Sequence, residues 1–170
     1  MTIDSGIDAP SGTTEPTVAL RVVTTYDDHT RRVDIALTGS ESVLVEEAAP
    51  GRGVTRFPTE QLWPVVRDLL PPLRQLTSAP RGRPATDPRR PGPTFVQDCR
   101  AFVALATVVD DQVSVRTWLA TDDDLWSVQS QDDGSSDISL APDGAVADLL
   151  VWDVTSALEH LVRQQELSAS

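Results

Sequence analysis

Aspartates are the residues of this chain best suited to chemistry, and they gather in its second half. Eleven aspartates and a single basic residue, Arg116, lie in residues 110–153. Carboxylate oxygens bind calcium, but a calcium loop needs ligands at alternating positions, a glycine at position six and a glutamate at position twelve. Three groups come closest to such a site: Asp110-Asp111, Asp122-Asp123-Asp124, and Asp132-Asp133 with Asp137.

The spacing of these groups is typical of turns and not of a calcium site. Residues 132–137 fail the register of a calcium loop, and no glutamate closes the segment. Aspartate is common in β-turns because its carboxylate accepts hydrogen bonds from the backbone of the turn. We therefore interpret the aspartate groups as turns and predict no bound metal.

Motifs for zinc binding and for nucleophilic catalysis are missing from the sequence. His29, Cys99 and His160 stand far apart, whereas zinc ligands come in closely spaced pairs. No Gly-x-Ser-x-Gly elbow and no glycine-rich phosphate loop is present. Cys99 stands near Phe95 and Phe102, which favours an inert buried thiol. We predict no catalytic residue and no cofactor, and an activity from dispersed carboxylates stays open.

Four tryptophans are the most suggestive binding residues. Trp118 and Trp126 fall on neighbouring strands of a predicted hairpin, where cross-strand aromatic pairs are common. Trp63 and Trp152 stand near the starts of two predicted helices. Two interpretations are open: all four tryptophans fill the core, or Trp118 and Trp126 form an exposed patch that binds a partner protein.

The overall composition argues against several classes of protein. A net charge of −12 excludes a generic nucleic-acid binder and disfavours an anionic membrane surface, because both carry negative charge themselves. The longest nearly apolar stretch, residues 101–109, is much shorter than a membrane helix. With one cysteine and no signal peptide, we expect a cytoplasmic protein. All fourteen basic residues are arginines, which is typical of a high-GC genome such as an actinobacterial one.

Residues 77–94 form a basic, proline-rich segment in an otherwise acidic chain. They hold five prolines and only one acid, Asp87. We interpret the segment as an extended linker stiffened by proline. It either lies on acidic parts of its own chain or docks a partner through its four arginines: Arg81, Arg83, Arg89 and Arg90.

The elements that position these residues indicate an internal repeat. Residues 17–76 and 95–164 each run from strands with alternating apolar residues, through acidic turns, to an amphipathic helix. The paired aspartates of the two copies, at 27–28 and 110–111, are 83 positions apart. Two such units close one core between them, which neither buries alone. Residues 1–16 are small, polar and acidic, and we expect a disordered tail there.

In the first copy we expect four antiparallel strands near residues 18–25, 33–37, 42–47 and 54–57. A helix follows, with Thr59 as its N-cap and Pro71-Pro72 at its end. Its apolar stripe consists of Leu62, Val65, Val66, Leu69 and Leu70.

In the second copy we expect a strand at 95–109, a hairpin at 113–130 and a short strand at 138–140. The second helix begins at an Asp153 cap or earlier, near Asp143. Its apolar stripe consists of Leu150, Val154, Ala157, Leu158 and Leu161. The sequence thus predicts one α+β domain over residues 17–164, with an antiparallel sheet or two half-sheets and two helices.

One stretch carries a likeness to a known family. Residues 54–72 read VTRFPTEQLWPVVRDLLPP after the strand-forming run at 43–45, and residues 138–161 are their counterpart. This layout resembles the EspG-like chaperones associated with type VII (ESX) secretion, which are built from two pseudo-symmetric sheet-and-helix halves. The chain is shorter than typical members and lacks an obvious N-terminal helical segment. No binding residues are therefore carried over from the family.

These observations predict a non-enzymatic, cytoplasmic protein-binding module, a monomer or homodimer without nucleic-acid or membrane partners. The resemblance implies a secretion chaperone that holds a helical secreted protein as its client. The alternative is a small-molecule or regulatory binding domain with a pocket between the two halves.

Overall fold

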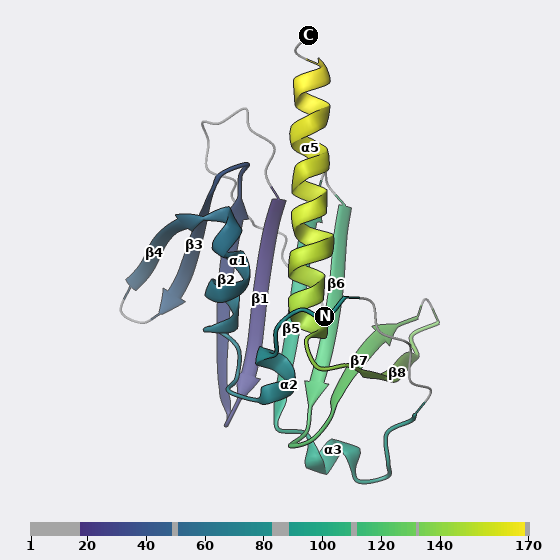
Figure 1. Cartoon of the computed structure of the whole chain (residues 1–170). Helices are drawn as coiled ribbons and strands as arrows, with labels where there is room; N and C mark the ends of the chain where they lie inside the picture. Colours follow the sequence, from purple (N-terminus) through teal and green to yellow (C-terminus); the bar gives the residue numbers. More distant parts are fainter. Residues whose placement is uncertain (1–17, 49–50, 83–88, 110–111, 132, 169–170) are drawn as a thin grey trace.

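The computed structural model describes residues 18–48, 51–82, 89–109, 112–131 and 133–168. Eight strands in these residues form one antiparallel sheet with the order β4-β3-β2-β1-β5-β6-β7-β8 (Figure 1). The strands are β1 (Val18–Tyr26), β2 (His29–Leu37), β3 (Glu41–Ala48), β4 (Gly51–Pro58), β5 (Ala101–Val109), β6 (Gln112–Ala120), β7 (Leu125–Ser130) and β8 (Ser136–Ala141). The predicted α+β class is confirmed, and the two halves share a single sheet through the β1–β5 pair.

The hairpin of β1 and β2 shows how the local sequence sets the strands. Val18, Leu20 and Val22 alternate with half-buried neighbours, which is the period of a strand with one face on the core. Asp27 and Asp28 form the two-residue turn with φ angles of 48° and 62°. Two consecutive positive φ angles are typical of a type I′ turn, whose twist matches that of the strands, and aspartate tolerates them.

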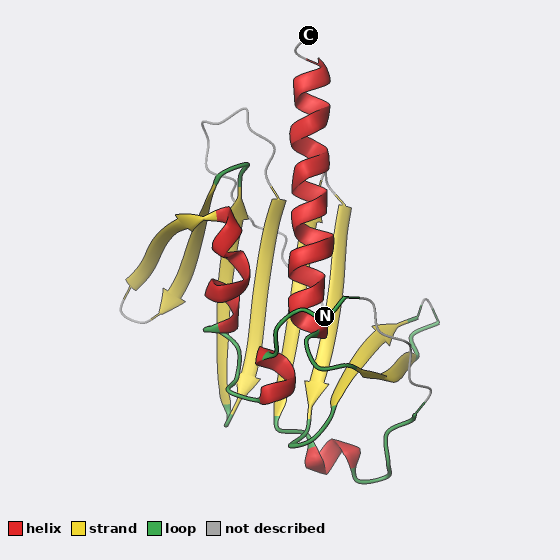
Figure 2. Ribbon diagram, viewed as in Figure 1, coloured by secondary structure: helices red, strands yellow, loops and turns green. Residues whose placement is uncertain are grey.

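Apart from the one-turn helix α3 (Phe95–Asp98), the helices lie on one face of the sheet (Figure 2). In the first half, the 3₁₀ turn η1 (Thr59–Gln61) leads into α1 (Leu62–Arg67), and α2 (Arg74–Thr77) follows. In the second half, α4 (Ala145–Asp148), the π-helical turn η2 (Leu149–Val154) and α5 (Thr155–Ser168) follow one another without a break. The apolar residues predicted for both helices face the core, with the following side chains buried: Leu62, Val66, Leu70, Leu150, Val154, Leu158 and Leu161. The predicted end of the first helix at Pro71-Pro72 is wrong, because α1 ends at Arg67 and Leu70 lies in the turn that follows it.

Both predicted helix caps are wrong. Thr59 does not cap α1, because its hydroxyl bonds Ser42 Oγ at 2.9 Å and the Thr38 carbonyl oxygen at 3.1 Å, which ties the turn to β3. Asp153 lies inside the second helix. That helix begins at Ala145, after Gly144 with a φ of 88°, so the earlier of the two predicted starts is correct.

The strand predicted at 95–109 is too long at its N-terminal end. Phe95–Asp98 form a one-turn helix, α3, and β5 begins at Ala101. Gln97 and Asp98 donate their backbone N–H groups to the Thr94 carbonyl oxygen, and the Thr94 hydroxyl bonds the Asp98 carboxylate at 2.6 Å. These local bonds compete with strand pairing and favour a turn of helix.

The two halves pair their strands in the same register. Each residue pair of β1 and β2 recurs 83 positions later in β5 and β6, so that Val22↔Val33 corresponds to Leu105↔Arg116. The β2–β3 and β6–β7 pairs agree at the same offset. The helices differ in length, and the internal repeat stays a prediction that these registers support.

Some predictions fall outside the described residues. They concern the disordered tail at 1–16, the turn at 110–111, the linker segment 83–88 with Arg83, and Asp132.

Candidate functional site

Trp118 and Trp126 do not form one exposed patch. In the β6–β7 ladder Trp118 pairs with Ser127, and Trp126 pairs with Leu119. Since successive residues of a strand point to opposite faces, the two indole rings lie on opposite faces of the sheet. Their exposed fractions are 5% and 6%. The interpretation of both as core residues is therefore the one that the geometry supports.

Trp118 forms the floor of a groove on the helix-covered face. The groove has a volume of about 1000 Å³ and lies between strands β6–β8 and the continuous helix of α4, η2 and α5. Apolar side chains dominate its lining, among them Trp118, Leu140 and Leu149. Trp152, from η2, also lines the groove, and 58% of its surface is exposed.

The register explains why the groove opens here. Position 33 in β2 corresponds to position 116 in β6, but Val33 is buried whereas Arg116 is exposed. On β6, Trp118 is buried beneath the second helix, whereas Arg116 is exposed and lines the groove. Among the described residues Arg116 has no ion-pair partner. Its guanidinium is available to a carboxylate of a bound molecule.

The start of the second helix holds the linker against the groove. Asp148 Oδ1 accepts hydrogen bonds from the backbone N–H groups of Arg81 at 2.8 Å and Gly82 at 2.9 Å. Asp148 Oδ2 is buried and has no partner among the described residues. Arg74 also forms an ion pair with Asp143. Because one carboxylate oxygen binds two N–H groups of the linker, the rim of the groove at Gly82 is fixed in place.

The π-helical turn belongs to the wall of the groove. The Thr155 hydroxyl donates to the Val151 carbonyl oxygen in the preceding turn, a side-chain bond that competes with the regular helical ladder. A π turn carries one extra residue, which changes the direction of the side chains around it. Trp152 projects from this turn away from the stripe formed by Leu150 and Val154.

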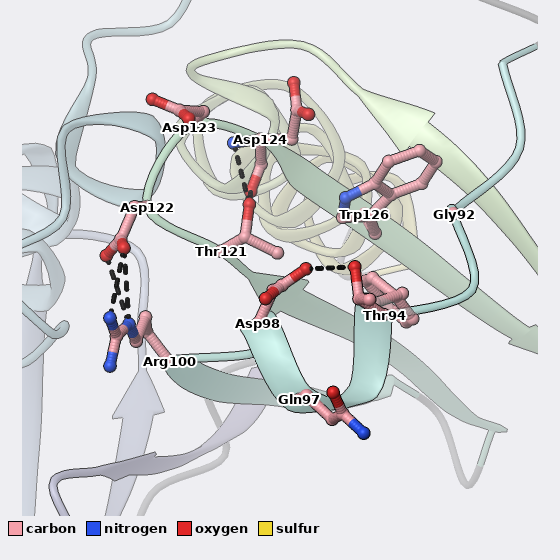
Figure 3. A pocket seen from close by; sticks show the side chains of 11 residues that line it. Gly92, Thr94, Gln97, Asp98, Arg100, Thr121, Asp122, Asp123, Asp124 and Trp126 are labelled. Atoms are coloured by element: carbon pink, nitrogen blue, oxygen red, sulfur yellow. Dashed lines mark hydrogen bonds and ion pairs between the residues drawn. The ribbon is translucent and has the colours of Figure 1, made fainter.

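A second cavity, of about 450 Å³, lies near the start of β7 (Figure 3). We call it the acidic pocket, and it is lined by four carboxylates, one guanidinium and two aromatic rings among other groups: Asp98, Asp122, Asp123, Asp124, Arg100, Phe95 and Trp126. The turn that carries three of the acids is closed by a hydrogen bond from the Asp124 N–H to the Thr121 hydroxyl, at 3.1 Å.

One of the four acids in this pocket is already paired. Arg100 and Asp122 form an ion pair with an Nη2–Oδ2 distance of 3.2 Å. The hydrogen bond with Asp122 raises the pKa of the Arg100 guanidinium. Phe95 packs edge-on against Trp126, with ring centroids 5.5 Å apart. The remaining three carboxylates give the pocket a negative charge beside an aromatic wall.

The linker arginines are exposed where the structure describes them. Arg81, Arg89 and Arg90 are on the surface, and Arg83 lies outside the described residues. The three described arginines do not line either cavity, although Gly82 lines the groove and Gly92 the acidic pocket. A docking role for the linker arginines stays a prediction.

The remaining polar candidates are dispersed. Cys99 is half-buried, donates to the Ala101 carbonyl oxygen at 3.5 Å, and burial raises the pKa of its thiol. His29 is exposed at the start of β2, and His160 lines the groove. Within the residues that the structure describes, no group of three or more histidine, cysteine, aspartate or glutamate side chains is arranged to hold a metal ion.

Comparison with protein-family models, with characterised proteins and with solved structures found no match. Among the described residues, no helix has the length and apolar character needed to cross a membrane.

Sequence reasoning did not single out Trp152 as the exposed tryptophan, although a signal was present. Trp152 stands two positions after Leu150 and two before Val154, so it falls outside the apolar stripe of its helix. Helical spacing alone therefore places this large aromatic side chain on the exposed side of its helix. The acidic pocket was not predictable, because it requires α3 beside the β6–β7 turn.

Proposed function

We propose that this protein is a non-enzymatic binding module, which holds a segment of a partner protein in the groove between β6–β8 and the second helix. The observation that carries the proposal is the exposed indole of Trp152 beside a groove with an apolar floor. An exposed tryptophan next to further apolar surface is typical of a protein interface. Tryptophan is also enriched among the few residues that dominate binding energy.

The shape and charge of the groove favour an amphipathic helix as the bound segment. An open apolar groove accepts the apolar side of a helix through residues spaced three and four positions apart. Arg116 at the groove has no ion-pair partner among the described residues, and it fits an acidic residue at the edge of such a helix. The client we propose is therefore a helical segment with an apolar stripe and a flanking acid.

The specific form that we propose is a cytoplasmic secretion chaperone like the EspG-like proteins of type VII secretion. Two features support it: a sheet made of two meanders that meet at β1 and β5, and a helix after each meander. A helical secreted protein is then the expected client. Its release elsewhere in the cell requires no chemistry by this chain.

The proposal is tested by affinity capture from a lysate of the native organism. Three forms serve as bait: wild type, Trp152→Ala and Val54→Ala. Val54 is also exposed, at 60%, but lies on β4. We expect one helical protein at near-stoichiometric amount, reduced at least about tenfold by Trp152→Ala and unchanged by Val54→Ala.

Two results would contradict the proposal. One is the absence of any near-stoichiometric protein with wild-type bait, and the other is a partner that binds the Trp152→Ala form equally well. Native mass spectrometry of the purified protein then decides for the alternative function. A small molecule that remains bound to wild type would favour the small-molecule domain.

A further inference from the structure

The sheet has a second face, opposite the groove, which the described helices leave largely uncovered. Val103, Leu105 and Trp118 are buried on the side of the helices, so the residues between them in β5 and β6 point to the other side. Apart from α3, which packs against Trp126, the described helices all lie on the groove side (Figure 2). The residues of β5 and β6 on the uncovered side are half-buried or exposed: Phe102, Ala104, Ala106, Val108, Val113, Val115, Thr117 and Leu119.

These residues, together with Val128 of β7 and Ile138 of β8, form a surface that we call the neutral face. Val128 pairs with Thr117 across β6 and β7, and Ile138 pairs with Val128 across β7 and β8, so all of them share one side of the sheet. Val113 and Val115 are 63% and 49% exposed. No residue of the neutral face carries a charge.

The same side of the first half is charged. It carries the following residues: Arg21, Arg32, Asp34, Glu47, Arg52 and Arg56. Arg21 lies directly beside the neutral face, opposite Ala106 in the β1–β5 pair. Its charge is neutralised by Asp34 in an ion pair with an Nε–Oδ1 distance of 2.6 Å. The apolar surface is therefore confined to the second half of the sheet and ends at β1.

The size of this surface matches the requirement of a protein interface. A strand rises about 3.3 Å per residue and neighbouring strands lie about 4.8 Å apart, so β1 and β5–β8 present roughly 600 Å² on this side. Monomeric proteins rarely expose apolar patches larger than a few hundred Å². Two such faces in contact bury roughly 1,200 Å², the lower limit for a stable interface. The area is sufficient for a dimer of modest affinity.

The lack of charge favours a second copy of this chain as the occupant. Around a two-fold axis each residue lies near its own copy, so a charged surface would meet like charge there. The chain has a net charge of −12, and two copies repel each other wherever acidic surfaces approach. Small side chains such as Ala104 and Ala106 also make this surface flat, which suits a second sheet stacked about 10 Å away.

We propose that the neutral face is a homodimer interface, in which the sheets of two copies stack face to face about a two-fold axis. Val113 and Val115 become buried in the dimer. The inference does not rest on the function proposed for the groove, because the groove lies on the opposite side of the sheet. Both grooves stay on the outside of the dimer, so one dimer offers two binding sites for client segments.

The test is sedimentation velocity on the full-length protein from about 1 µM to about 200 µM. Dimerisation follows mass action, so we expect the mean mass to rise with concentration from 18.4 kDa toward twice that value. A wild-type protein that stays monomeric over this range would overturn the proposal, and the face would then belong to another occupant, such as a different protein.

Two matched variants locate the interface. Val115→Glu places a negative charge within the neutral face of each copy and should weaken dimerisation at least about tenfold. Val54→Glu is the control, because Val54 is an equally exposed strand valine on the same side of the sheet but lies on the edge strand β4. It should change the dimer affinity less than about twofold. Circular dichroism verifies that each variant is folded, and Val113→Glu replaces Val115→Glu if the latter does not fold.

The groove needs a separate control, because an exposed tryptophan could itself drive self-association. Trp152→Ala should dimerise as wild type does, although it should lose the client in the capture experiment. The location of the interface would be wrong if the folded Val115→Glu form dimerised normally, if Val54→Glu weakened the dimer equally, or if Trp152→Ala abolished it. A failure of the capture experiment alone would leave the dimer in place.

Discussion

In the first half of the sheet, β1 and β2 pack Val33 and Ile35 into the core under a helix of six residues. In the second half, the same register places Arg116 and Trp118 at the equivalent positions, under a helix that runs from Ala145 to Ser168. Val33 is 1% exposed, whereas Arg116 is exposed at a groove. The strand register is therefore common to both halves, and the groove of the second half comes from different side chains at equivalent positions and from the longer helix.

The opposite face of the sheet shows the same contrast. Arg21 and Asp34 pair across β1 and β2 through two hydrogen bonds, of 2.6 and 3.0 Å. The corresponding pair across β5 and β6 is Ala104 and Thr117. The hydrogen bond with Asp34 raises the pKa of the Arg21 guanidinium. One half thus uses an ion pair where the other uses small neutral side chains.

The largest expected effect concerns equivalent core positions in the two halves. Ile35→Ala and Trp118→Ala should each lower the free energy of unfolding by about 3–4 kcal/mol, because both side chains are buried. Since β1 and β5 join the halves, both variants should shift one common transition in urea, followed by circular dichroism and by fluorescence. Trp152→Ala, at an exposed position, should leave the midpoint nearly unchanged. Two separate transitions, each shifted by one variant only, would show that the halves unfold independently.

The next effect concerns the glycine that begins the second helix. Gly144 has a φ of 88°, and a methyl group there would overlap the Ala79 carbonyl oxygen of the linker. Gly144→Ala should lower the free energy of unfolding by about 2–4 kcal/mol through backbone strain and the steric overlap. Gly134→Ala is the matched control, since Gly134 has a φ of 81° and open space around it. Equal losses in thermal denaturation would mean that the linker does not pack at Gly144.

A smaller effect is expected when Arg21 and Asp34 are replaced by the residue types found at the equivalent positions of the second half. Arg21→Ala alone should lower the free energy of unfolding by about 1–2 kcal/mol, because Asp34 loses its partner in a partly buried site. Arg21→Ala/Asp34→Thr reproduces the Ala104 and Thr117 pair and should recover at least half of that loss. Urea denaturation measures both variants. A double variant that is less stable than Arg21→Ala would contradict the equivalence of the two positions.

The smallest expected effect is a dependence on pH in the first half. The hydrogen bond from Arg31 holds the pKa of the Glu46 carboxyl below its usual value. Its contribution to stability is therefore complete above the unfolded pKa of about 4.3 and is lost as the pH falls through the lower folded pKa. Because both side chains are partly exposed, the contribution is at most about 1 kcal/mol.

Glu46→Gln should remove this contribution at pH 7 and flatten the fall in stability between pH 5 and pH 3 by about that amount. Urea denaturation at a series of pH values measures it. An unchanged pH profile would assign the acid sensitivity to other carboxyl groups.

Strand positions could be predicted from the sequence because the alternation of apolar with more polar residues is visible within a few neighbouring positions. Val18, Leu20 and Val22 show it directly, and the turn at Asp27-Asp28 marks the end of β1. The apolar stripe of the second helix is likewise correct, since helical spacing determines which side chains face the sheet. The first stripe is only partly helical, because α1 ends at Arg67, before Leu69 and Leu70. Caps were predicted less well. The Thr59 hydroxyl has a competing partner in Ser42, which lies seventeen positions earlier and becomes close only after folding.

The candidate sites depend on contacts that a single sequence does not reveal. Trp118 and Trp126 were expected to be cross-strand neighbours, but the β6–β7 register is shifted by one residue from that pairing. A shift of one residue reverses the face of a side chain. The acidic pocket also requires α3, which the sequence predicted as strand. The aspartates of the β6–β7 turn were correctly placed in a turn, and their proximity to Trp126 follows only from the fold.

The most direct test of the central claim places a photo-crosslinking residue in the groove. We would substitute Trp152→p-benzoyl-phenylalanine in the full chain and irradiate it within the native cell, with the same substitution at Val54 as the control. The account predicts one discrete adduct with a second protein at position 152 and none of that size at position 54. An absence of any adduct at position 152, or the same adducts from both positions, would contradict the assignment of the groove as the binding site.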